Sequence, residues 1–177
     1  MVVPYIRDIF LLKTKPVRAS WFIWTALGAI AFFSQLAKGA TDSLWLVGGQ
    51  TLAVLIVFLL SLKFGVGGLT KRDIKALIGA AVGLVLWYIT DEPLWELFIV
   101  IVIDAIGAIL TIIKSYDDPE SETLSTWFMS GTSGILGALA VGSLNPILLV
   151  YPVYLMVANY AVVGAILFGR RRIRKSI

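Results

Sequence analysis

Six apolar runs, each close to the length of a helix that crosses a lipid bilayer, make up most of this 177-residue chain. The core of a bilayer is about 30 Å thick and requires roughly 20 residues of helix. Gly, Pro or charged residues separate one run from the next. The runs cover residues 20–37, 43–62, 74–88, 94–113, 124–141 and 146–168. The pattern predicts an all-α polytopic membrane protein.

The composition supports a membrane protein and argues against most classes of enzyme. Hydrophobic residues make up 59% of the chain and charged residues only 15%, which is too little polar surface for a soluble protein of this size. The chain contains neither Cys nor His, the side chains on which thiolate metal sites and many nucleophile–base pairs depend. We therefore expect no enzyme, no metal site and no cofactor.

A shorter segment, MVVPYIRDIFLL at residues 1–12, precedes the six runs. At about 1.5 Å of rise per residue it is too short to cross a membrane, and it contains Pro4, Arg7 and Asp8. We expect a short first helix. It is either the end of a truncated helix or a half-span packed inside the bundle.

The basic residues predict the orientation, because cytoplasmic loops carry the excess of Lys and Arg. If the seven segments alternate in direction, thirteen of the 15 Lys and Arg residues fall on one side; only Lys38 falls on the other, and Arg7 lies within the first segment. This distribution predicts a multi-pass protein of a bacterial-type plasma (inner) membrane with a cytoplasmic C-terminus. The tail GRRRIRKSI is interpreted as an orientation anchor, with recruitment of a partner or of anionic membrane lipids as the alternative. The positive charge does not predict nucleic-acid binding, since no soluble domain carries it.

Two stretches of the chain repeat each other. KTKPVRASWFIW begins at Lys13 and KSYDDPESETLSTWF begins at Lys114, and further matches follow at offsets of 100 to 106 residues. The matched positions are Lys13 and Lys114, Pro16 and Pro119, residues 20–22 and 126–128, Gly28 and Gly134, Ser43 and Ser143, and residues 64–65 and 168–169.

The repeat predicts two triple-helix bundles joined by a linker helix, a 3+1+3 arrangement. Its parts are a first repeat at residues 1–65, a linker transmembrane helix at 66–93, a second repeat at 94–169 and a basic tail at 170–177. One extra crossing between two three-helix units makes the units parallel in the membrane, and parallel repeats enclose a path between them.

This plan, together with VPYIRDIFLLKTKPVRAS at residues 3–20, resembles the PQ-loop and SWEET-like sugar-transporter superfamily. The resemblance implies a transporter, with a gating role for Pro4 and Tyr5 and a sugar contact for Asn159 on the last helix. Tyr5 stands where the family has glutamine, and Ala105 and Ile106 stand where the second proline pair would fall. The PnuC-type vitamin transporters are a more distant resemblance.

Three tryptophans are candidates for contact with a solute. Trp21 and Trp24 lie one helical turn apart, and Trp127 matches Trp21 in the second repeat. An indole ring can stack on a sugar or a flat ring and donates one hydrogen bond. The alternative is an aromatic belt at the level of the lipid headgroups, because all three lie near charged loops.

Neutral polar side chains at mid-membrane depth are further candidates, because polar groups inside a bundle are costly unless they are paired or hydrated. Gln50, Tyr154 and Asn159 suit an uncharged solute, with hydrogen bonding between helices as the alternative role. Asp104 is the one carboxylate with apolar sequence on both sides. It is interpreted as a proton-coupling site or, with some preference, as the structural partner of Arg7.

The acidic stretch YDDPESE, residues 116–122, is expected to be a solvated loop. As a whole, the sequence predicts a facilitator or secondary carrier of a small polar, uncharged solute such as a sugar or a nucleoside-like compound. The expected partners are this solute and the membrane lipids, and a homo-oligomer is compatible with the sequence. The alternative function is a non-transporting membrane scaffold or assembly protein that holds a partner through the basic tail and the acidic loop.

Overall fold

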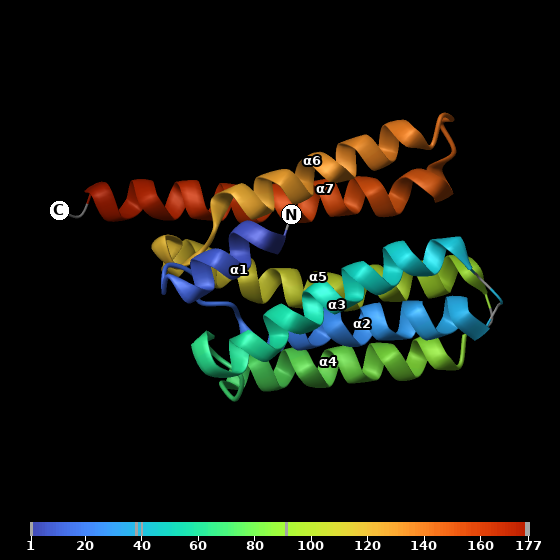
Figure 1. Ribbon diagram of the computed structural model, residues 1–177, viewed down its shortest axis with the longest axis horizontal. Coiled ribbons are helices and arrows are strands. Elements are labelled where there is room, and N and C mark those ends of the chain that lie inside the picture. The colour runs from blue at the N-terminus through green and yellow to red at the C-terminus, as the bar shows by residue number, and fades with distance from the viewer. Residues whose placement is uncertain (1, 38, 40, 91, 176–177) are drawn as a thin grey trace.

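The computed structural model describes residues 2–175 apart from residues 38, 40 and 91. Within this part the chain is all-helical, and a single bridge between Val17 and Val66 is its nearest approach to a strand pair. The elements, labelled in Figure 1, are α1 (Val2–Phe10), α2 (Arg18–Ala37), α3 (Asp42–Phe64), α4 (Lys71–Tyr88), α5 (Pro93–Asp117), the short 3-10 turn η1 (Pro119–Ser121), α6 (Leu124–Ala140) and α7 (Pro146–Lys175).

Four of these helices are long and apolar enough to cross a membrane by length and composition. They are α2, α3 from Leu44 to Phe64, α5 from Leu94 to Asp117, and α7. The predicted all-helical fold and the multi-pass character are confirmed at this level. Helices α4 and α6 also lie where the sequence predicts helices. They are not among these four, because charged residues occupy the first turn of α4 and because α6 has only 17 residues.

The helix ends follow local sequence signals. Thr70 and Asp73 form a capping box at the start of α4, in which each side chain accepts from the backbone of the other residue. Pro93 and Pro146 open α5 and α7 at the position where a helix tolerates proline. The short α1 has nine residues, and its Tyr5 and Ile9 are fully buried, so this helix is packed inside the bundle.

We refer to α1–α3 as the first half and to α5–α7 as the second half. In the first half, α3 packs against both α1 and α2; in the second half, α7 packs against both α5 and α6. The halves meet where α2 packs against α5 and where α1 packs against α6. The remaining helix, α4, packs on α5 and α2 at the side of the molecule.

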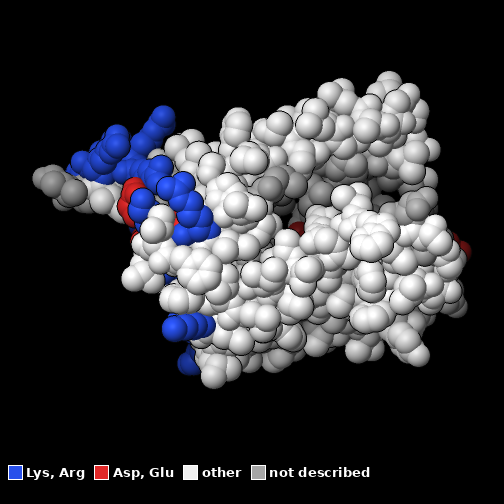
Figure 2. Space-filling view, viewed as in Figure 1, with Lys and Arg blue, Asp and Glu red and all other residues white. Residues whose placement is uncertain are grey.

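Three connections and the end of α7 gather at one end of the bundle, which we call the basic end. There the amide of Lys15 donates to the carbonyl of Ser121 (3.0 Å), and the bridge at Val17 joins the connection before α2 to the one after α3. An ion pair between Arg170 and Glu120 ties α7 to the same region (3.0 Å). Figure 2 shows most of the visible Lys and Arg at this end, while the long sides of the molecule carry almost no visible charged residue. The turns after α2, α4 and α6 lie at the opposite end, which we call the far end.

The packing is tight at the basic end and open toward the far end. The main buried cluster consists of Tyr5, Ile9, Trp21, Val57, Trp127, Val162, Val163 and Ile166. In contrast, no side chain described in the far-end stretches 44–56 of α3 and 146–161 of α7 is buried. Figure 2 shows a hollow in the apolar surface on the far-end side of the molecule, between the two helix pairs α2–α3 and α6–α7. The pairs α2–α3 and α6–α7 therefore meet toward the basic end and part toward the far end, while α2 stays packed on α5.

Candidate functional site

Four aromatic rings from both halves meet where α1, α2 and α6 approach one another, and we call them the aromatic cluster: Tyr5, Trp21, Trp24 and Trp127. The ring centroid of Trp21 lies 5.0 Å from that of Tyr5, 5.3 Å from that of Trp24 and 6.4 Å from that of Trp127. Tyr5 and Trp24 also contact Trp127, at 6.0 and 5.9 Å. Because Tyr5, Trp21 and Trp127 are almost completely buried, they do not form a lipid-facing belt.

The packing of α2 on α5 fixes where the tryptophans of α2 lie. A Cβ at Gly107 would come within 3.0 Å of the indole nitrogen of Trp24, so the glycine allows Trp24 to lie directly on α5. One turn before Trp24, the hydroxyl of Ser20 donates to the carbonyl of Gly107 (2.8 Å) and accepts from Thr111 (3.1 Å). These bonds anchor the basic-end half of α2 to the second half of the molecule.

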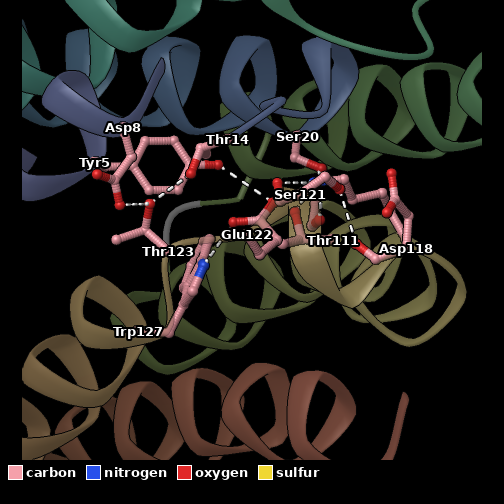
Figure 3. A network of polar contacts seen from close by, with 12 residues as sticks. Tyr5, Asp8, Thr14, Ser20, Thr111, Asp118, Ser121, Glu122, Thr123 and Trp127 are labelled. Carbon is pink, nitrogen blue, oxygen red and sulfur yellow. Dashed lines mark hydrogen bonds and ion pairs between the residues drawn. The ribbon is translucent and has the colours of Figure 1, made fainter. Parts of the chain in front are cut away.

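The carboxylate of Glu122 lies on the basic-end side of the aromatic cluster and accepts hydrogen bonds from three side chains (Figure 3). The indole of Trp127 donates to Oε2 (2.8 Å), and the hydroxyl of Tyr5 donates to Oε1 (3.2 Å). Lys114 forms an ion pair with Oε1 (2.9 Å), and the side chain of Glu122 is completely buried. A buried carboxylate is tolerated when it is paired and hydrogen-bonded in this way. Of the three donors, Tyr5 comes from the other half of the molecule.

A second polar contact between the halves lies beside the first. The hydroxyls of Thr14 and Thr123 share a hydrogen bond (2.5 Å), and Thr123 also donates to Asp8 at the end of α1 (2.9 Å). Together with the bond from Tyr5 to Glu122, these contacts join the first half to the stretch 121–123. We call this set of polar contacts the latch.

A polar cavity of about 560 Å³ opens at the basic end, outside the latch. Both halves contribute to its lining, with side chains of either charge and several hydroxyls. The charged residues that line it are Asp8, Lys13, Lys15, Asp118, Glu120, Glu122 and Arg170. The latch and the aromatic cluster thus separate a polar cavity at the basic end from the hollow that opens toward the far end.

Asp104 lies near the middle of α5. Its Oδ2 accepts a short hydrogen bond from the hydroxyl of Tyr154 on α7 (2.5 Å), and its carbonyl accepts from the indole of Trp24 (3.4 Å). The expected pairing with Arg7 is not found: Arg7 is exposed on α1, and no ion pair joins these two described residues. The reason is positional, because α1 packs on α3 and α6 and not on α5.

The structure brings some of the predicted site residues together and leaves others apart. The three predicted tryptophans and Tyr5 share one cluster, and Tyr154 meets Asp104. Asn159 donates to the carbonyl of Leu155 in its own helix (2.7 Å), and Gln50 is exposed on α3. Pro4 is half-buried on α1, next to Tyr5.

Sequence reasoning missed Glu122 and Lys114. The expectation of a solvated loop was wrong for Ser121 and Glu122, which are buried, although Asp117, Asp118 and Glu120 are exposed. A signal was present: Lys114 and Glu122 have opposite charges and flank a loop that the turn at Pro119 keeps short. That spacing permits an ion pair across the loop.

No protein-family model, curated protein or solved structure matches this chain. The residues of the site themselves limit what it can do. Aromatic rings, hydroxyls and one half-buried carboxylate lie close together, and such groups can stack on and hydrogen-bond a small solute. The latch, in contrast, can hold the two halves together or release them.

Proposed function

We propose that the protein is a membrane transporter, a facilitator or secondary carrier, that moves a small polar solute by alternating access between its two halves. One observation carries the proposal: the aromatic cluster and the latch join α6–α7 to the first half at the basic end, while the pairs α2–α3 and α6–α7 part toward the far end. This is the form expected of a carrier that is open to one side of the membrane and shut to the other. Sugars and nucleoside-like compounds are the first solutes to test, because they offer faces that an indole can cover.

The contacts between helices support two parallel triple-helix units joined by α4. Each helix of the first half has a counterpart in the second: α3 and α7 each pack against both other helices of their half. The contact of α2 with α5 is matched by that of α6 with α1, as a two-fold relation along the membrane normal requires.

Matched glycines support the same repeat. A Cβ at Gly65 would lie 2.5 Å from the carbonyl oxygen of Pro16, and a Cβ at Gly169 would lie 3.2 Å from the ring of Pro119. In each proposed unit, the pair therefore brings a proline that precedes the second helix next to a glycine in, or directly after, the third helix.

In this proposal all six long helices cross the membrane, and α1 enters it partway. The apolar part of α4 begins at Ala76, after Lys75, and α6 spans about 25 Å at 1.5 Å per residue. The basic end faces the cytoplasm of a bacterial-type inner membrane, because Lys and Arg gather there. The closed side is then cytoplasmic and the hollow faces outward.

Release of the solute inward requires that the aromatic cluster and the latch come apart while the far-end halves of the helices approach each other. The rings of Tyr5 and Trp21 move with the first half, and the ring of Trp127 moves with the second. A solute held at the cluster would therefore be shielded from one side at a time.

Uptake into proteoliposomes tests the proposal, with radiolabelled glucose, uridine and choline as probes. We expect uptake of at least one probe, and we expect Trp21→Ala and Trp127→Ala to reduce it without loss of folded protein. Trp45→Ala is the matched control, because Trp45 is 86% exposed on α3, away from the cluster. Normal uptake by both cluster variants would show that the cluster is not on the path of the solute.

A non-transporting scaffold is the second candidate, and two observations favour it. Tyr154 is bonded from helix to helix, and Asn159 is satisfied within its own helix. A cross-link between Cys residues placed at Lys13 and Ser125, on the two halves at the basic end, separates the two functions. The cross-link should block the movement that a carrier needs for transport, and it should leave the function of a rigid scaffold unaffected.

A further inference from the structure

A carboxylate within α5 is not part of the latch. Asp104 lies near the middle of α5 and is half-buried, as are the side chains of Trp24 and Tyr154 beside it. A carboxylate at membrane depth carries a high desolvation cost unless a positive charge or a proton neutralises it. The ion pairs among the described residues are Lys114–Glu122, Arg170–Glu120 and Arg172–Asp117, so none of them supplies that charge.

Three aromatic side chains surround this carboxylate. The hydroxyl of Tyr154 orients Oδ2, and the ring of Tyr151 lies 6.3 Å from the ring of Tyr154. Tyr151, which is 37% exposed, lies close enough to Asp104 for the two to interact electrostatically. On the other side, the indole of Trp24 donates to the carbonyl of Asp104 and contacts the rings of Trp21 and Trp127. The carboxylate thus sits at the edge of a continuous aromatic surface.

A carboxylate bordered by aromatic side chains has the chemistry that recognises a positively charged organic group. Rings attract a cation placed within about 6 Å of their centroids, and the attraction is strongest for tryptophan and for sites shielded from water. Because the charge of an ammonium group is spread over its substituents, it gives up water more readily than a metal ion does. The arrangement lacks the several oxygen ligands that Ca²⁺ or Mg²⁺ requires.

We propose that Asp104, with Trp24, Tyr151 and Tyr154, binds a positively charged amine or quaternary ammonium group of the transported solute. The inference rests on the proposed transport function and names the solute class as a small organic cation, in place of the uncharged solute that the sequence predicts. That prediction rested on Gln50, Tyr154 and Asn159. In the structure Tyr154 donates to Asp104, Asn159 donates to its own helix, and Gln50 is exposed.

Binding to the protein in lipid nanodiscs tests the site without any need for transport. The probes are choline and its uncharged isostere 3,3-dimethylbutan-1-ol, measured by isothermal titration calorimetry at the same pH and salt concentration. We expect choline to bind at least about tenfold more tightly than the isostere, the difference that about 1.4 kcal/mol produces. Equal binding of the two probes, or no binding of choline, would overturn the proposal.

Asp104→Asn keeps an acceptor for Tyr154 and removes the charge, so we expect it to weaken choline binding at least about tenfold. Glu96→Gln is the matched control: it changes the same charge in the first turn of the same helix, eight residues before Asp104, and should leave binding unchanged. If Asp104→Asn does not fold, Tyr154→Phe replaces it, because it removes the hydroxyl that orients the carboxylate and keeps the ring. An unchanged affinity in the substituted protein would contradict the role of Asp104.

Two further outcomes are distinguishable. A proton could neutralise the same carboxylate, and proton flux into proteoliposomes without choline measures this. Proton flux that Asp104→Asn abolishes, together with equal binding of choline and its isostere, would make the occupant a proton and overturn the cation proposal. Asp104-dependent binding of choline without choline uptake would refute the transport function and leave the binding site standing.

Discussion

The hydroxyl of Tyr5, on the half-length first helix, donates a hydrogen bond to the carboxylate of Glu122, 117 residues further along the chain (3.2 Å). Both side chains are buried, and the bond joins the two halves of the molecule at the basic end. The same carboxylate holds Trp127, whose ring faces Tyr5 edge-on. The residue that closes the basic end therefore also places one ring of the aromatic cluster.

Tyr5→Phe removes this bond and keeps the ring contacts. A hydrogen bond to a charged group contributes about 1.5 kcal/mol or more, so loss of the hydroxyl should shift the balance between closed and open basic ends about tenfold toward the open form. Spin labels on Cys residues at Lys13 and Ser125 report the separation of the two halves. The protein has no native Cys, so the labelling is specific.

We expect the distance distribution of the Tyr5→Phe protein to gain a longer component. Tyr88→Phe is the control, since Tyr88 is 82% exposed on α4 and should not change the distribution. Identical distributions for Tyr5→Phe and the unsubstituted protein would remove Tyr5 from the latch.

Glu122→Gln tests the buried ion pair. The substitution leaves Lys114 as a nearly buried charge without its counter-charge, and loss of one partner from a buried pair costs about 3 kcal/mol or more of stability. Thermal unfolding in a mild detergent should show a clear decrease in Tm. Glu120→Gln, two residues away, breaks the exposed pair with Arg170 and should change the stability by less than about 1 kcal/mol. Similar effects of both substitutions would contradict the structural difference between the two carboxylates.

Gly65→Ala tests the close contact after α3. An added Cβ would lie 2.4 Å from the carbonyl oxygen of Ser61 and 2.5 Å from that of Pro16, and backbone atoms cannot move aside as a flexible side chain can. We expect a loss of about 1–3 kcal/mol in the free energy of unfolding. Gly49→Ala is the control, and the expected change in stability has the opposite sign. A Cβ there meets no atom within 4 Å, and alanine should stabilise α3 by up to about 1 kcal/mol. A tolerated Gly65→Ala would argue against the proposed role of the proline–glycine pair.

The positions of the helices could be predicted because each apolar run ends at a charged residue, a proline or a tight turn. The predicted run 124–141 matches α6 (Leu124–Ala140) within one residue. The largest difference is at α7, which continues past Phe168 to Lys175. Gly169 was interpreted as a break, but its position is helical, and the glycine allows the backbone of Tyr116 to approach within 2.6 Å of where a Cβ would stand.

The candidate site could be predicted only where the repeat or the membrane environment constrains it. The tryptophans were singled out because Trp21 and Trp127 occupy matched positions in the proposed repeat, and the structure places their ring centroids 6.4 Å apart. Glu122 was missed because an acidic loop is usually solvated, and only the tertiary fold shows that Tyr5 and Trp127 cover this residue. The partner of Asp104 was misassigned because charge alone suggested Arg7, whereas helix packing places Tyr154 beside it.

Labelling of single Cys residues from one side of the membrane tests the central claim most directly, because the proposed carrier requires two parallel units closed at the same end. The positions are Lys13, Ser125 and Arg174 at the basic end and Trp45 and Leu144 at the far end. In intact bacterial cells a membrane-impermeant maleimide should label only the two far-end positions, and all five should react after the membrane is opened. Labelling of Arg174 and Lys13 from opposite sides would contradict the parallel arrangement, and with it the proposed carrier.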